Sequence, residues 1–239
     1  MGTAAPAQAE FRQTCAVAAH RGDWSASTEN GMPAMRSAVA QRADYLETDV
    51  RLTKDRQLVL MHDARVNRTT NGYGQVANKT LAQIEAMRLN DGSRVPPLRR
   101  LLTMAKPTGV HLLIELKAMG GLASFRALAD LIRGFGSDRV RITSVHTELL
   151  DTLASVAPGI EQGIIATTLL TPAEVAPYDS VLINFNHMTV EWLESMTLPV
   201  YAWTLNDEQQ WSASHADELA AVITDAPALF LPWRETGCA

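Results

Sequence analysis

Short runs of apolar and β-branched residues recur along the chain, and between them lie stretches with apolar residues three or four positions apart. The first pattern predicts strands and the second predicts helices. The expected strands are Ala16–His20, Tyr45–Val50, Leu112–Leu116, Val140–Ser144, Gln162–Ile165, Ser180–Asn184, Val200–Thr204 and Ala221–Thr224. Strands that alternate with helices from end to end are typical of a parallel α/β fold.

Helical patterns follow most of these strands. The clearest are Met32–Gln41, Ser124–Phe135, Glu148–Val156, Val190–Met196 and Asp207–Ala213. Thr171 and Glu174 have the spacing of a capping box with Pro172 at the first helical position, and Thr80 with Gln83 repeats that spacing. Both pairs therefore predict helix starts.

The alternation is interrupted after the second strand. A turn at Lys54–Gln57 leads back through Leu58–His62, which indicates a hairpin, and the long segment 63–100 follows it. Long segments of this kind in compact domains are usually functional. We expect one barrel domain over residues 15–239, with 63–100 as a flap-like insertion, after a flexible tail at 1–14.

Polar residues gather where the expected strands end. His20, Glu47, Glu115 and Asp225 are examples. The carboxyl ends of the strands carry the active site in a (β/α)₈ TIM barrel. The alternative is an open doubly wound sheet, but no Gly-x-Gly-x-x-Gly fingerprint follows the first strand. The pattern favours a single (β/α)₈ TIM barrel.

Composition narrows the functional classes. The 239-residue chain has 46% hydrophobic residues and a net charge of −5, so it suits one large core and offers no basic footprint for nucleic acid. No apolar stretch has the length of a transmembrane segment. Signatures of serine hydrolases, His-Glu-x-x-His zinc proteases and P-loop enzymes are absent from the sequence.

The two cysteines and the N-terminal segment bear on the compartment. Ala7 and Ala9 have the spacing found before a signal-peptide cleavage site, although the segment is equally typical of a flexible alanine-rich tail. Cys15 and Cys238 would both lie at the N-terminal face of a closed barrel, so a disulfide is geometrically possible; two unrelated thiols are the alternative. Together these features favour export, extracellular or periplasmic, over a cytoplasmic location.

Three carboxylates form a candidate metal site. Glu47 and Asp49 are two positions apart on one strand and share a direction, and Glu115 ends the next strand. An all-oxygen set suits one hard divalent cation, Mg²⁺ or Ca²⁺. These acids could instead pair with Arg21, Arg51 or Lys117 in a structural network, but convergence of all three favours the metal.

Two histidines and two cations complete the candidate site. His20 and His62 flank the carboxylate pair in sequence, and imidazole can accept and donate protons near neutral pH. Arg21 and Lys117 suit the oxygens of a phosphate group. We therefore expect a metal-assisted phosphodiesterase.

The order and spacing of these residues resemble the glycerophosphodiester phosphodiesterase family, over about Val17 to Pro227. The segments that carry the resemblance are Ala19–Gly22, Glu29-Asn30, Asp44–Val50, Leu52–Asp55, Met61–Asp63, Arg68–Gly72, Val95–Leu98, Ile114–Lys117, Trp203–Asn206 and Ile223–Pro227.

The resemblance implies hydrolysis of a small glycerophosphodiester to glycerol 3-phosphate and an alcohol. It implies that Glu47, Asp49 and Glu115 hold the metal, that His20 is the general base and that His62 is the general acid. The substrate contacts that it implies are Arg21 and Lys117 at the phosphate, Glu29 in support and Trp203 as an apolar wall. In related enzymes the glycerol hydroxyl beside the phosphate attacks first, and water opens the resulting cyclic phosphate.

The sequence departs from the family at the rim of the site. Gly31 replaces the usual threonine, and Val145 stands where an aromatic residue is usual. Because these changes lie at the substrate rim, the resemblance does not specify the head group of the substrate. Cleavage of a lysophospholipid, with Trp24 and Tyr73 as candidate acyl contacts, and a non-catalytic phosphodiester-binding barrel are the alternative functions.

Overall fold

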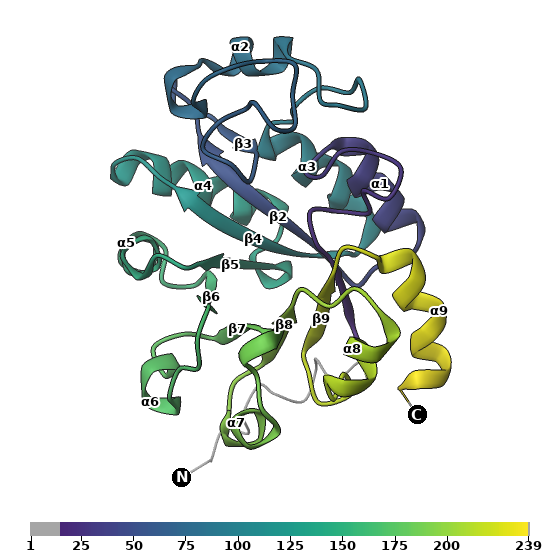
Figure 1. Ribbon diagram of the computed structural model, residues 1–239. Helices are drawn as coiled ribbons and strands as arrows, with labels where there is room; N and C mark the ends of the chain where they lie inside the picture. Colours follow the sequence, from purple (N-terminus) through teal and green to yellow (C-terminus); the bar gives the residue numbers. More distant parts are fainter. Residues whose placement is uncertain (1–14, 239) are drawn as a thin grey trace.

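Within residues 15–238, eight parallel strands close into a barrel surrounded by helices (Figure 1). The computed structural model describes these residues, so the tail predicted at 1–14 and Ala239 lie outside the described part. The barrel strands are β1 (Val17–Ala19), β2 (Tyr45–Leu52), β4 (His111–Ala118), β5 (Val140–Ser144), β6 (Glu161–Ala166), β7 (Ser180–Asn184), β8 (Val200–Trp203) and β9 (Ala221–Thr224). Strand β1 pairs with both β2 and β9, which closes the ring and confirms the predicted (β/α)₈ barrel.

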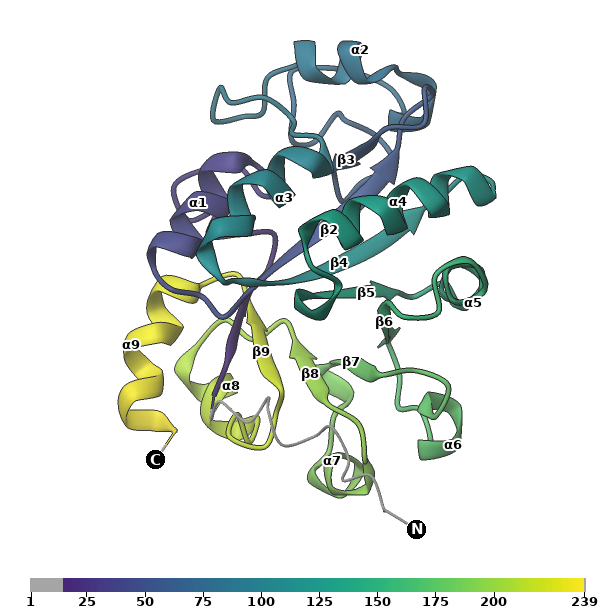
Figure 2. The same ribbon diagram turned by 180° about the vertical axis from the view of Figure 1, so that it is seen from behind.

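Helices follow the strands and lie outside them (Figure 2). They are α1 (Met32–Ala40), α2 (Leu81–Ala86), α3 (Leu98–Ala105), α4 (Leu122–Phe135), α5 (Thr147–Val156), α6 (Pro172–Val175), α7 (Val190–Ser195), α8 (Glu208–Ala213) and α9 (Pro227–Gly237). Short 3₁₀ turns are η2 (Val76–Asn78), η3 (Lys106–Thr108), η4 (Ser137–Arg139) and η5 (Phe185–His187). Both predicted capping boxes are present, at Thr80 before α2 and at Thr171 before α6.

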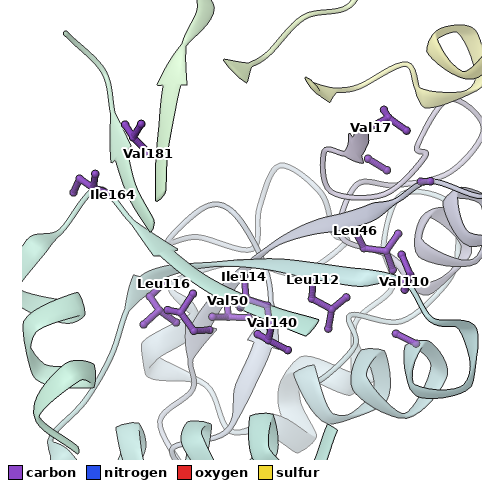
Figure 3. Close-up of a cluster of buried hydrophobic side chains, with 14 of the residues drawn as sticks. Val17, Leu46, Val50, Val110, Leu112, Ile114, Leu116, Val140, Ile164 and Val181 are labelled. Carbon is purple, nitrogen blue, oxygen red and sulfur yellow. The ribbon is translucent and has the colours of Figure 1, made fainter. Parts of the chain in front are cut away.

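Alternate residues of the strands face the helices and the barrel interior. Leu112 and Ile114 of β4 belong to the outer layer between strands and helices, part of which Figure 3 shows with Val140 of β5. Leu113, between them in sequence, belongs instead to an interior cluster with residues such as Tyr201 of β8. This two-sided burial explains why the strands are mostly apolar throughout.

The interior cluster also contains a charged residue that the sequence patterns did not reveal. Arg141 of β5 is only 8% exposed, donates to the hydroxyl of Tyr201 and pairs with Glu161 at 2.6 Å. Tyr45 packs edge-on against Tyr201, with ring centroids 5.7 Å apart. These side chains fill the barrel towards the N-terminal ends of its strands and so lie beneath any site at the opposite mouth.

The segment after β2 folds into a packed unit beside the barrel (Figure 1). Strand β3 (Leu58–Leu60) pairs antiparallel with β2, as the hairpin prediction requires, and α3 begins at Leu98, inside the predicted 63–100 segment. The unit has its own apolar cluster, which includes Val66, Val76 and Ile84. It is joined to the loop after β1 by two reciprocal hydrogen bonds of 3.0 Å between Thr28 and Asp91.

The two ends of the described chain are linked covalently. Cys15 and Cys238 form a disulfide with a Cα–Cα distance of 6.2 Å, so the bond that the sequence made possible is present. Beside it, Arg234 of α9 lies 2.6 Å from Asp44, whose carboxylate also accepts from the backbone N–H of Val17. In the part of the chain described here, no helix has the length and hydropathy to cross a bilayer.

Candidate active site

Three acidic side chains converge at the carboxyl ends of β2 and β4. Glu47 and Asp49 point the same way from β2, and Asp49 is register-paired with Glu115 on β4. The three residues are 5%, 1% and 8% exposed, and one carboxylate oxygen from each lies within 4.8 Å of the other two. The convergence predicted from their spacing is therefore present in the structure.

The electrostatics of this trio fit a bound cation. Burial and the neighbouring charge of Asp49 raise the pKa of Glu47 well above its usual range, and burial foremost raises that of Glu115. Lys117 partly offsets the charge, because its Nζ lies 3.2 Å from Asp49 Oδ1 and 2.7 Å from Glu115 Oε1. A hard divalent ion prefers oxygen ligands of this kind and would relieve the remaining repulsion.

Arg21 lies against these carboxylates because of the turn that follows β1. Arg21 and Gly22 both have left-handed backbone conformations, with φ of 58° and 83°. A Cβ on Gly22 would lie 2.7 Å from the carbonyl carbon of Ala34, so glycine is required there. The turn directs the backbone N–H of Arg21 to Glu47 and places its Nε 3.2 Å from Asp49 Oδ2.

Asn30 holds Asp49 from the other side. Its amide donates to Asp49 Oδ2 at 2.8 Å, and its carbonyl oxygen accepts from the backbone N–H of Asp49 and from the hydroxyl of Thr48. Asn30 also has a left-handed conformation, with φ of 58°. Local sequence patterns do not predict this role for Asn30, although it directly follows Glu29 in a segment that carries the resemblance.

His20 is oriented by a carboxylate from the far end of the chain. Its Nδ1 lies 2.6 Å from Asp225 Oδ1, and its Nε2 lies 3.9 Å from Glu47 Oε2. Despite burial, the hydrogen bond to His20 lowers the pKa of Asp225, so this carboxylate is ionised and acts as an acceptor. Nδ1 of His20 therefore carries the proton, and its Nε2 is the nitrogen available for chemistry.

His62 has a corresponding partner in the next residue. Its Nδ1 lies 2.7 Å from Asp63 Oδ1, while Asp63 Oδ2 accepts from Arg68 Nε at 2.6 Å. The hydrogen bond from Arg68 is the main cause of the lowered pKa of Asp63. Burial lowers the pKa of His62, which favours its neutral form.

Arg68 connects this histidine to the rest of the site. It donates two hydrogen bonds, of 2.7 and 2.8 Å, to Glu29, and Glu29 in turn accepts from Arg21 at 3.0 Å. Although burial raises the pKa of Glu29, Arg68 and Arg21 lower it, so that the carboxylate is ionised. Glu29 therefore orients Arg21 from behind, which is a supporting position like the one that the resemblance implied.

A pocket of about 160 Å³ brings most of the predicted residues together. Seven of the nine line it, namely His20, Arg21, Glu47, His62, Glu115, Lys117 and Trp203. Asp49 and Glu29 lie behind Arg21 and contact it. A larger cavity of about 400 Å³, lined by residues such as Arg42 and His111, contains none of the nine.

The pocket has a polar half and an apolar half. The charged residues and histidines come from β2 and β4 and from the segments that follow β1 and β3, and β5 adds the polar residue Thr143. The apolar half is formed by Val145, Ile165, Leu182, Trp203 and Ile223. Trp203 is fixed by a hydrogen bond from its indole N–H to the carbonyl of Leu182, at 3.2 Å, so its ring serves as a wall.

The amino-acid sequence of the chain is similar to those of known proteins. Residues 20–229 match the sequence profile of the glycerophosphoryl diester phosphodiesterase family. The chain belongs to this family. A glycerophosphodiester phosphodiesterase of Caldanaerobacter subterraneus subsp. tengcongensis is 29% identical over 230 residues, which is 88% of this chain and 94% of that protein.

Solved structures share the fold. A glycerophosphodiester phosphodiesterase from Agrobacterium tumefaciens superposes with a TM-score of 0.82 at 24% identity, over 91% of this chain and 99% of that one. A phosphodiesterase from Oleispira antarctica, solved with the product sn-glycerol-3-phosphate, has a TM-score of 0.86 at 22% identity, over 93% and 98%. These likenesses confirm the barrel architecture.

Proposed function

We propose that this protein hydrolyses glycerophosphodiesters to glycerol 3-phosphate and an alcohol, using one divalent cation held by Glu47, Asp49 and Glu115. The observation that carries the proposal is the meeting of these carboxylates with two carboxylate-backed histidines in one pocket. Family membership supports the same reaction class. The ligand set suits Mg²⁺ and Ca²⁺ alike, and ion replacement distinguishes them.

The two histidines divide the proton transfers. His20 accepts at Nε2 the proton of the attacking glycerol hydroxyl beside the phosphate, because its Nδ1 proton is held by Asp225. His62 takes up a proton before this step, against the effect of burial, and Asp63 beside its Nδ1 stabilises the resulting imidazolium; His62 then gives its Nε2 proton to the oxygen of the departing alcohol. Water then opens the resulting cyclic phosphate to glycerol 3-phosphate, with the two proton transfers reversed. When bound, the cation neutralises phosphoryl charge and lowers the pKa of a coordinated hydroxyl.

The remaining residues bind and orient the substrate. Arg21 and Lys117, which lie against Oδ2 and Oδ1 of Asp49, present donors to the phosphate oxygens. Trp203 contacts the carbon atoms of the glycerol or the head group. Residues 63–97 hold His62 in place through Asp63 and Arg68.

The test is release of glycerol 3-phosphate from glycerophosphocholine, with and without EDTA. We expect EDTA to abolish release, and we expect His62→Ala to lower kcat by roughly 10²–10⁴-fold. His215→Ala is the matched control, since that imidazole is exposed and lies near Glu218. EDTA-resistant release, or full activity in His62→Ala, would contradict the mechanism, while re-addition of each ion identifies the one that the protein prefers.

Cleavage of a lysophospholipid is the second candidate. Leu122, Val145 and Leu169 follow β4, β5 and β6 at the barrel mouth and are 50%, 41% and 45% exposed. Apolar side chains in such a position suit an acyl chain. Faster choline release from lysophosphatidylcholine than from glycerophosphocholine would favour this candidate, and the reverse order would favour the first.

We also propose that the protein works outside the cytoplasm. The disulfide between Cys15 and Cys238 supports this, because such bonds persist in oxidising compartments. Thiol titration of the denatured, unreduced protein from its own cells tests the proposal. Two free thiols would contradict it.

A further inference from the structure

One uncharged polar side chain stands at the boundary between the two halves of the pocket. Thr143 of β5 lines the pocket and is only 1% exposed. It is register-paired with the carboxylate residue Glu115 on one side and with Gly163 on the other. The polar half of the pocket thus ends, and the apolar half begins, at this threonine.

The orientation of Thr143 directs its hydroxyl away from β6. A Cβ built on Gly163 would lie 3.3 Å from Thr143 Cγ2, so the methyl group of Thr143 faces that glycine. The methyl and hydroxyl groups diverge from the same Cβ, and the hydroxyl therefore points elsewhere. Among the described residues Thr143 Oγ1 has no hydrogen-bond partner, although buried hydroxyls nearly always have one.

The other groups that line the pocket are accounted for. The charged side chains pair with one another or with a metal or phosphate, and the indole N–H of Trp203 is bonded to Leu182. The hydroxyl of Thr143, itself buried, is therefore the neutral donor and acceptor of this lining that has no partner among the described residues, and it stands beside the apolar half of the pocket. A glycerol group has this combination of a carbon skeleton and neutral hydroxyls.

We propose that Thr143 Oγ1 hydrogen-bonds the terminal hydroxyl of the substrate's glycerol group and selects for substrates that carry it. This inference rests on the proposed function, since it specifies the substrate of the same site. A buried polar group that is paired by the substrate discriminates against an analogue without that group, because the protein atom is then left unpaired.

The experiment compares two substrates in the metal-loaded enzyme. One is glycerophosphocholine, and the other is the phosphocholine diester of 1,2-propanediol, which lacks the terminal hydroxyl and keeps the hydroxyl beside the phosphate-bearing carbon. For the wild type we expect kcat/KM to favour glycerophosphocholine by roughly tenfold, which is typical of one hydrogen bond in a buried site. In Thr143→Val we expect this preference to disappear, and Thr143→Ser should retain it.

Ser180→Ala is the matched control. Ser180 is a fully buried residue of β7 whose hydroxyl also has no partner among the described residues, and it does not line the pocket. We expect this variant to keep the wild-type preference. Neither Thr143→Val nor Ser180→Ala should lower the Tm, since each removes an unpaired buried hydroxyl.

The outcomes separate this inference from the proposed function. If the wild type releases choline from neither substrate, the proposed function fails. If the wild type cleaves both substrates without preference, or if a folded Thr143→Val keeps the preference, the function stands and the role of Thr143 is overturned. If Thr143→Val does not fold, the test rests on the wild type and on Thr143→Ser. Loss of the preference in Thr143→Ser would then contradict the assignment.

Discussion

At the scale of single residues, the site depends on partners that hold the functional side chains in one orientation. Asp225 acts on His20, and Asp63 acts on His62, each through the Nδ1 atom. Asn206 in turn donates to Asp225 at 2.8 Å. The histidines therefore present their Nε2 atoms to the reaction, and loss of the partner should alter proton transfer before it alters the fold.

Asp225→Asn tests this dependence. An asparagine amide can donate to His20 Nδ1, which would favour the tautomer whose proton is on Nε2 and remove the base. We expect kcat on glycerophosphocholine to fall by roughly 10²–10⁴-fold, with KM changed much less. Asp130→Asn, at an exposed carboxylate that pairs with Arg133, is the control. Unchanged kcat in Asp225→Asn would show that this carboxylate does not set the tautomer.

The sequence predicted the functional side chains better than their partners. Glu47 and Asp49 were predictable together, because two positions on one strand share a direction. Asp225 lies 205 residues from His20 and meets it because β9 closes the barrel beside β1. Such a contact is set by closure of the fold, which local spacing does not encode.

At the scale of elements, the loop after β1 is fixed to α1 by one buried carboxylate. Asp23 accepts hydrogen bonds from Ser37 of α1, from Gln41 directly after α1 and from Ser25 in the loop. Burial raises the pKa of Asp23, but these hydrogen bonds outweigh it and lower the pKa. Because the folded pKa is below the unfolded one, the carboxylate stabilises the fold above the unfolded pKa, and this stability is lost as the pH falls through the folded pKa.

Asp23→Asn should therefore lower the free energy of unfolding at neutral pH, by about 1–3 kcal/mol. The difference from the wild type should narrow as the pH falls below about 4, where the wild-type carboxyl also becomes protonated. Urea denaturation at a series of pH values measures both effects. A difference that is independent of pH would mean that the charge of Asp23 is not what holds the loop.

The elements themselves were largely predictable, and the exceptions have physical causes. The barrel strands follow apolar runs, and the threonine-based capping boxes correctly marked α2 and α6. Helix α9 was not predicted, because Pro232 lies inside it and proline normally ends a helix. Arg141 was not recognised as an interior residue, since its burial depends on Tyr201 and Glu161 from other strands.

At the scale of the whole molecule, one covalent bond joins the segment just before β1 to the residue just after α9. The cysteines are 223 positions apart and are the two ends of the described chain, so the disulfide closes all of it into one loop. Cys15 precedes β1, whereas the site lies beyond the carboxyl ends of the strands. The disulfide and the chemistry are thus located at opposite ends of the barrel, so the covalent link can be changed without touching the site.

Reduction of the disulfide should destabilise the fold and spare the activity of the protein that remains folded. Cross-links that close long loops typically contribute about 2–5 kcal/mol, mainly by restricting the unfolded chain. For a chain of this size that corresponds to a fall in Tm of roughly 5–20 °C. The fall in Tm is measured by thermal melts of the wild type with and without dithiothreitol and of the Cys15→Ser/Cys238→Ser double variant.

The control is Arg234→Gln, which removes the ion pair with Asp44 at the same end of α9 and leaves the disulfide intact. We expect it to retain dithiothreitol sensitivity, whereas the double cysteine variant should have none. kcat on glycerophosphocholine at about 25 °C should match the wild type in both variants. If kcat fell with Tm in the double variant while the protein was still folded, the two ends of the barrel would be coupled, and the disulfide would act on the chemistry as well as on stability.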